Sequence, residues 1–160
     1  MSDVLLVLNE RALREYIMDA FKDRDLAFTE CGTAVQAMEH LQSTRFDAIV
    51  IEARMYPGTA SQDPVLSDMA AMLPQSKYNE MLLHWQVACR VMELAREPES
   101  ANRSTPFIIK FPLDAESILH GSGDMLSPDA VKKDLAKLEP ATPLYEARAG
   151  DVIETLRAYA

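Results

Sequence analysis

The chain has 160 residues, of which 48% are apolar and 26% charged, and these proportions suit one globular domain rather than a disordered or low-complexity protein. Its 25 acidic and 16 basic side chains give a net charge of −9, which disfavours direct binding to nucleic acid or to anionic lipid. The longest apolar run, at 4–8, is far shorter than the roughly 20 residues of a membrane-spanning helix, so we expect no membrane association.

The first third of the chain alternates strand-like and helix-like patterns. The apolar run at 4–8 is typical of a strand buried on both faces, whereas 11–22 has apolar residues three and four positions apart, which predicts a helix. Thr33 is a suitable N-cap for a second helix. The inward residues of that helix are expected to be Val35, Met38 and Leu41. Further strands are predicted at 26–30 and 46–52.

Prolines and serines interrupt the pattern after the third predicted strand. We interpret 57–80 as an insertion at this point, with at most a short helix over 65–72. The clearest helical pattern follows at 81–96 and ends before Pro98, and 97–105 is predicted to be a polar loop. The remaining predicted elements are strands at 106–111 and 141–147, and helices at 114–120, 127–138 and 151–159.

This order of elements predicts an α/β fold with a doubly wound, five-stranded parallel sheet, the flavodoxin-like three-layer α/β/α sandwich. Ligands of such folds lie at the carboxyl ends of the strands. The two cysteines, Cys31 and Cys89, and the three histidines have none of the spacings of metal ligands. We therefore expect no metal and no cofactor, and we interpret both cysteines as core residues.

Four segments resemble response-regulator receiver (CheY-like) domains in the correct order. They are VLLVLNERALR at 4–14, TAVQAMEHL at 33–41, FDAIVIEARM at 46–55 and TPFII at 105–109. The resemblance implies a single receiver-like domain over 1–160, with 57–80 inserted after the third strand. Receivers bind magnesium through two acidic residues after the first strand and through a phosphoryl-accepting aspartate on the third.

The residues at those positions depart from the receiver pattern. The acidic pair aligns with Leu8 and Asn9, or with Asn9 and Glu10 if the register slips by one residue, and we prefer the first alignment. The acceptor position aligns with Glu52. Its carboxylate either mimics a phosphorylated state or merely faces water, and the sequence leaves both interpretations open.

Two further receiver features are missing from the aligned positions. The hydroxyl residue at the end of the fourth strand is replaced by Phe111, which cannot hydrogen-bond a phosphoryl oxygen. The lysine expected after the fifth strand has no counterpart there, although Lys110 or Arg148 is available as a cation near Glu52. We therefore expect a degenerate phosphoacceptor pocket with no catalytic residues and no metal.

These departures favour a cytoplasmic, non-enzymatic pseudo-receiver, a phosphorylation-independent protein-interaction module in signal transduction. The resemblance places its partner-binding face within 114–159, with Tyr145 and Asp151 as candidate contacts, and allows a homodimer through this face. The partner is expected to be a signalling protein. The alternative is a flavodoxin-like protein that binds a small ligand or nucleotide, for which the glycines around Ser122 are weak support because no phosphate-binding lysine follows.

Overall fold

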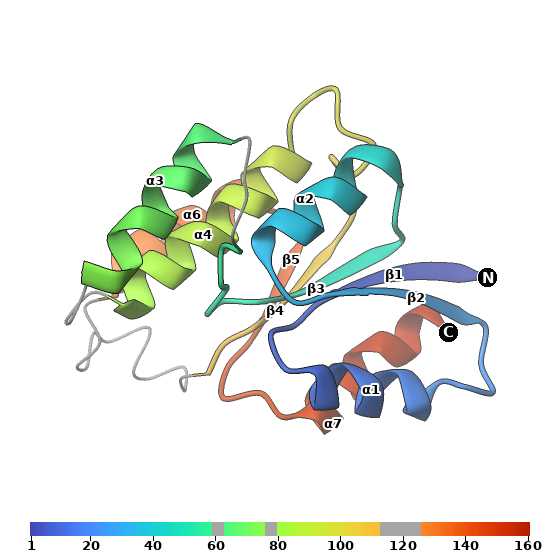
Figure 1. The fold of residues 1–160 in the computed structure, drawn as a ribbon. Coiled ribbons are helices and arrows are strands. Elements are labelled where there is room, and N and C mark those ends of the chain that lie inside the picture. Colours follow the sequence, from blue (N-terminus) through green and yellow to red (C-terminus); the bar gives the residue numbers. More distant parts are fainter. Residues whose placement is uncertain (59–62, 76–79, 113–125) are drawn as a thin grey trace.

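The computed structural model describes residues 1–58, 63–75, 80–112 and 126–160, which contain a five-stranded parallel β-sheet (Figure 1). Its strand order is β2-β1-β3-β4-β5, so the chain winds to both sides of β1. The doubly wound α/β fold predicted from the sequence is therefore confirmed. The strands are β1 (Ser2–Val7), β2 (Leu26–Cys31), β3 (Ala48–Glu52), β4 (Phe107–Lys110) and β5 (Ala141–Leu144).

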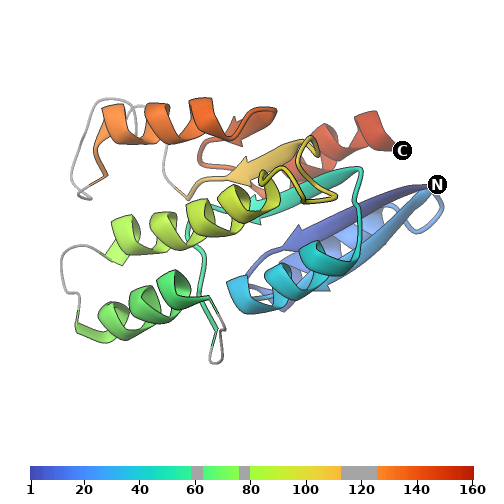
Figure 2. The same cartoon turned by 90° about the horizontal axis from the view of Figure 1, so that it is seen from above.

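Helices cover both faces of this sheet (Figures 1 and 2). One face carries α1 (Arg11–Ala20) and α7 (Ala149–Leu156). The other face carries α2 (Ala34–Ser43), α4 (Glu80–Ala95) and α6 (Pro128–Lys137). The helix α3 (Pro64–Met72) packs on α4, and short 3-10 turns follow α3 and α7 at Leu73–Gln75 and Arg157–Tyr159.

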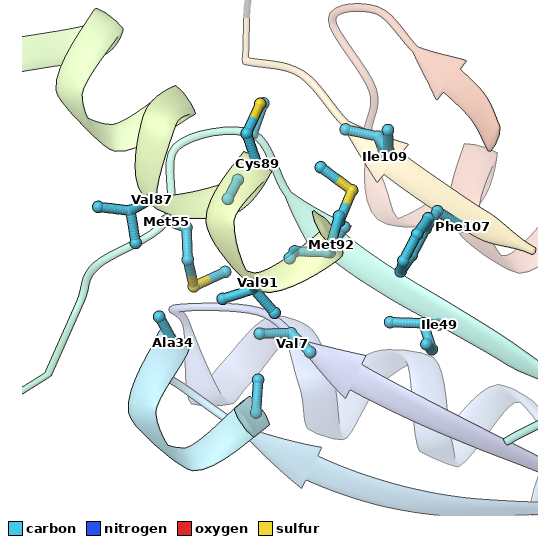
Figure 3. Close-up of a cluster of buried hydrophobic side chains, with 14 of the residues drawn as sticks. Val7, Ala34, Ile49, Met55, Val87, Cys89, Val91, Met92, Phe107 and Ile109 are labelled. Atoms are coloured by element: carbon cyan, nitrogen blue, oxygen red, sulfur yellow. The ribbon is translucent and has the colours of Figure 1, made fainter. Parts of the chain in front are cut away.

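Alternate residues of β1 enter two separate cores. Leu5 and Val7 face α2, α4 and α6, whereas Val4 and Leu6 face α1 and α7, and all four side chains are fully buried. This explains why the strand has a continuous apolar sequence rather than an alternating one. Figure 3 shows part of the first core, in which side chains of α4 lie over those of the strands.

Side-chain caps fix the starts of three helices. The Thr33 hydroxyl accepts a hydrogen bond from the backbone N–H of the third helical residue of α2, as the sequence predicts. Ser127 caps α6 in the same way, and Asp63 caps α3, each followed by a proline at the first helical position. The short helix predicted over 65–72 is thus confirmed as α3.

Two sequence-based details differ from the structure. In α2 the fully buried residues are Ala34 and Ala37, whereas Val35 is half-buried beside Gly58, because small residues allow α2 to pack closely on α4. Gly58 has a φ of 96°, which L side chains rarely adopt. The last strand ends earlier than predicted because the chain turns at Glu146, which has a φ of 46°.

The loop at 97–105 is polar as predicted, but two of its residues belong to the interior. Asn102 is fully buried, and its side chain accepts a hydrogen bond from the Phe46 N–H and donates to the carbonyls of Leu41 and Thr44. Thr105 is also buried. This polar network joins the loop to α2 and to the start of β3.

The two cysteines lie in the interior of the fold. Cys31 and Cys89 are free and buried, as expected, and burial raises the pKa of the Cys31 thiol to about 12. The predicted helix at 114–120 and the glycines around Ser122 lie outside the described residues. Within the described ranges, no helix is long and apolar enough to cross a membrane.

Candidate functional site

The carboxyl ends of the parallel strands bring the predicted pocket residues to one edge of the sheet. Glu52 at the end of β3 lies directly opposite Lys110 at the end of β4 in the strand register. Asn9 follows β1 and contacts Glu52, while Phe111 and Tyr145 follow β4 and β5. Asn9, Glu52, Lys110 and Phe111 of the predicted pocket thus lie at a common edge, and Tyr145, which the sequence suggested as a partner contact, lies there as well.

The side-chain amide of Asn9 is the centre of this edge. Its Nδ2 atom donates to Glu52 Oε2 at 2.6 Å and to the backbone carbonyl of Arg54 at 2.6 Å. Because both partners are acceptors, the amide nitrogen rather than the oxygen faces them. The Asn9 Oδ1 atom is buried and has no hydrogen-bond partner among the described residues.

The environment of the Glu52 carboxyl disfavours its ionised form. Burial raises the pKa of Glu52, and the negative charge of Glu10 raises it further. The positive charges of Lys110 and Arg54 and the hydrogen bonding from Asn9 act in the opposite direction but do not outweigh burial. The charge of Lys110 therefore acts on the pKa of Glu52. Lys110 is one of the two cations, with Arg148, that the sequence suggested near Glu52.

Leu8 and Glu10 contribute to the site less directly. The Leu8 side chain is fully buried in the core beneath α1 and α7, and its carbonyl oxygen accepts a hydrogen bond from Arg14. Glu10 is exposed at the start of α1, where its side chain makes no cap hydrogen bond. Asn9 is thus the residue after β1 whose side chain reaches Glu52, while Leu8 faces away from it.

An aromatic stack forms the other side of the site. Phe111 is fully buried and stacks on Tyr145 with ring centroids 5.3 Å apart and an interplanar angle of 27°. Trp85 of α4 packs on Phe111 at 5.1 Å. Burial also raises the pKa of the Tyr145 hydroxyl. Tyr145, a candidate partner contact from the sequence, is therefore half-buried against Phe111.

The sequence did not identify two members of this arrangement. Trp85 was recognised only as part of the inward face of a helix, and nothing in its spacing indicates contact with Phe111 across 26 residues of chain. Arg54 takes part through its backbone carbonyl, which no side-chain pattern reveals. The other predicted contact, Asp151, is exposed in the first turn of α7 and accepts from the Arg148 N–H at 2.8 Å.

The described residues do not fit a magnesium ion at this edge. A hard cation requires oxygen ligands, yet Asn9 directs its amide hydrogens at the carboxylate and carbonyl oxygens that would bind the ion. Leu8 offers no side-chain oxygen and faces the core. No cluster of three or more acidic, histidine or cysteine side chains with metal-binding geometry occurs elsewhere in the described ranges.

No protein-family model and no curated protein matches the chain. Solved structures do match it. The chemotaxis response regulator CheY4 of Vibrio cholerae has a TM-score of 0.60 at 15% identity, covering 100% of this chain and 99% of that one. The receiver domain of Francisella response regulator 1452 has a TM-score of 0.58 at 14% identity, covering 99% and 95% of the two chains.

A third structural neighbour was solved with a bound metal ion. The receiver domain of the sensor histidine kinase PA1611 from Pseudomonas aeruginosa, solved with a magnesium ion in its active-site cleft, has a TM-score of 0.52 at 16% identity, covering 99% of this chain and 96% of that one. The strand order and nearly complete coverage agree with the resemblance found in the sequence. The chain therefore has the fold of response-regulator receiver (CheY-like) domains.

Proposed function

We propose that this domain is a pseudo-receiver that acts in cytoplasmic signal transduction as a phosphorylation-independent protein-interaction module and not as an enzyme. The observation that carries the proposal is the pair of hydrogen bonds from Asn9 Nδ2 to Glu52 and to the Arg54 carbonyl. They use an uncharged amide to satisfy the oxygens that a divalent cation would otherwise bind. Both of these oxygens are thus hydrogen-bonded without a cation.

Electrostatics supports this proposal. Phosphoryl transfer depends on positioning and on positive charge that stabilises the transferred group. At this edge Asn9 supplies no charge, and burial together with Glu10 raises the pKa of Glu52, so its carboxylate is a less available nucleophile than an ordinary one. Lys110 is the cation opposite Glu52 in the register, and one ammonium group does not replace a divalent ion.

The aromatic stack supports the same conclusion. A phosphoryl oxygen needs hydrogen-bond donors, but Phe111 has none and is fully covered by its neighbours. Its contacts with Tyr145 and Trp85 hold the end of β4 in one packed arrangement. We infer that the domain presents a constant surface to a signalling protein, with the face within 114–159 and its exposed residue Asp151 as one candidate contact.

The direct test is phosphorylation by acetyl phosphate in the presence of magnesium, followed by intact-protein mass spectrometry. We expect no mass increase and no magnesium dependence. The matched control is the double variant Asn9→Asp/Glu52→Asp, which restores two short carboxylates at the edge and tests whether the assay detects acylphosphate on this fold. A stoichiometric, magnesium-dependent acylphosphate on the unmodified chain would overturn the proposal.

A further inference from the structure

An open groove lies between α3, α4 and α6, the helices whose arrangement is shown in Figure 2. Trp85 of its lining also packs on Phe111 of the Glu52 edge. Its volume is about 570 Å³. Apolar side chains from the three helices make up much of its wall, including Val65, which is 39% exposed on α3. The other apolar residues of the described lining are the half-buried Met69 and Leu82, the exposed Ala130, and the buried Trp85, Cys89, Leu126 and Val131.

A bidentate ion pair fixes the α3 wall of this groove. Arg90 on α4 donates to both carboxylate oxygens of Asp63, with distances of 2.7 and 3.0 Å, and Asp63 also caps α3. The Arg90 hydrogen bond lowers the pKa of the Asp63 carboxyl, so the pair is ionised at neutral pH. The position of α3 on α4 is therefore fixed by this ion pair as well as by apolar contacts.

Among the described residues, the charges of the groove lining are predominantly negative. Arg90 is paired with Asp63, and the acidic side chains of the described lining are Glu93 of α4 and Asp134 of α6. Asp134 accepts a hydrogen bond from the Trp85 indole at 3.0 Å, which places this acidic side chain beside the apolar floor. A complementary ligand must combine an apolar face with positive charge.

We propose that this groove binds a basic amphipathic helix of the partner protein. A groove with apolar walls between helices can accept the apolar face of one further helix. Lysine or arginine side chains beside that apolar face would contact Glu93 and Asp134. A second copy of this chain is a poorer occupant because each copy carries a net charge of −9. The proposal rests on the proposed function, since it names the partner class of that interaction module.

The single tryptophan of the chain provides a direct reporter, because Trp85 lines the groove. The probes are two synthetic 18-residue amphipathic helices with the same leucine face, one with a lysine polar face and one with a glutamate polar face. Tryptophan emission and the anisotropy of fluorophore-labelled peptide are measured together on the full chain. We expect saturable changes in both signals with the lysine peptide, and at least tenfold weaker binding of the glutamate peptide at low salt.

Matched variants locate the binding site. Val65→Asp places a charge in the groove wall and is expected to weaken binding of the lysine peptide at least tenfold, whereas Met72→Asp, at an exposed position of α3 outside the lining, should leave it unchanged. Glu93→Gln should weaken binding roughly threefold, while Glu154→Gln on α7 across the sheet should have no effect. Circular dichroism of each variant verifies folding.

Several results would overturn the inference. The first is equal binding of the two peptides, and the second is binding that Val65→Asp does not weaken, with unchanged Trp85 emission. The third is failure of the lysine peptide to bind, and the fourth is a concentration-dependent dimer that Val65→Asp abolishes. The last result would identify a second copy as the occupant. None of these outcomes bears on acetyl phosphate reactivity, so a failure here leaves the proposed function standing and a phosphorylated Glu52 would refute that function independently.

Discussion

The amide nitrogen of Asn9 lies 2.6 Å from a carboxylate oxygen of Glu52. The same nitrogen donates its second hydrogen to the Arg54 carbonyl, so one neutral group joins the ends of β1 and β3. With the amide nitrogen in this position, these oxygens face hydrogen atoms, whereas a divalent cation would need an oxygen of residue 9 to face it instead. The identity of residue 9 therefore decides whether this edge is bridged by a hydrogen-bonded amide or by an ion.

Asn9→Asp should create a magnesium or manganese site. Without a cation, the added carboxylate beside Glu52 lowers the melting temperature, because like charges repel and two hydrogen bonds are lost. Saturating magnesium should raise the melting temperature of the variant by about 5 °C, as expected for a ligand well above its dissociation constant. Calorimetric unfolding without magnesium and at magnesium concentrations that increase in tenfold steps measures this change in melting temperature.

The control for this experiment is Asn9→Ala, which removes the amide without adding a ligand. It should be destabilised to a similar degree and should show no response to magnesium. If the unmodified chain is stabilised by magnesium as strongly as Asn9→Asp, the amide does not exclude the ion and our interpretation of this edge is wrong.

Glu52→Gln should stabilise the protein increasingly as pH rises. The folded-state pKa of Glu52 is raised by burial, so the stability associated with its protonated form is present below the ordinary glutamate pKa of 4.5 and is lost as pH rises through the folded-state value. Glutamine cannot ionise, yet its side-chain oxygen still accepts from Asn9. Urea unfolding from pH 4 to pH 8 should show that the free energy of unfolding of the variant exceeds that of the wild type by an amount that grows with pH.

A second substitution checks the cause of this effect. Because the charge of Glu10 also raises the pKa of Glu52, Glu10→Gln should shift the wild-type pH dependence toward lower pH without abolishing it. If the stability gained by Glu52→Gln shrinks with rising pH, then Lys110 and Asn9 lower the pKa of Glu52 by more than burial raises it.

The fold could be predicted because its determinants are local. The buried run of β1, the inward spacing in α1 and the caps at Thr33 and Ser127 each specify an element within a few residues, and parallel strands joined by helices allow few topologies. In α2 the predicted inward residues Met38 and Leu41 do pack in the core, whereas Val35 does not. Ala34 and Ala37 were missed because alanines at a close helix contact carry little hydrophobic signal in a sequence.

The site was predictable only in outline. The resemblance to receivers grouped Asn9, Glu52, Lys110 and Phe111, and the meeting of parallel strand ends at one edge agrees with that grouping. Side-chain packing between segments distant in the chain decides which atoms of Asn9 face Glu52. The same kind of packing places Tyr145 on Phe111. Spacing contains no information on those contacts, and it did not reveal Trp85 as the third ring.

Phe111→Ala should lower the free energy of unfolding by about 4 kcal/mol, because the ring is fully buried between Trp85 and Tyr145 and its removal leaves a cavity. Phe111→Leu keeps most of the volume and should cost about 1.5 kcal/mol. Equilibrium urea unfolding distinguishes the two. Equal losses for alanine and leucine would show that the ring contacts themselves, rather than the filled volume, dominate the stability of this stack.

Asn102→Ala should destabilise the protein by about 3 kcal/mol, because Asn102 is fully buried and its amide serves three backbone groups. The substitution leaves the Phe46 N–H and the Leu41 and Thr44 carbonyls without this partner in the interior. Urea unfolding monitored by circular dichroism gives the loss. The exposed neighbour Ser104 provides the control, since Ser104→Ala should change stability by less than about 0.5 kcal/mol.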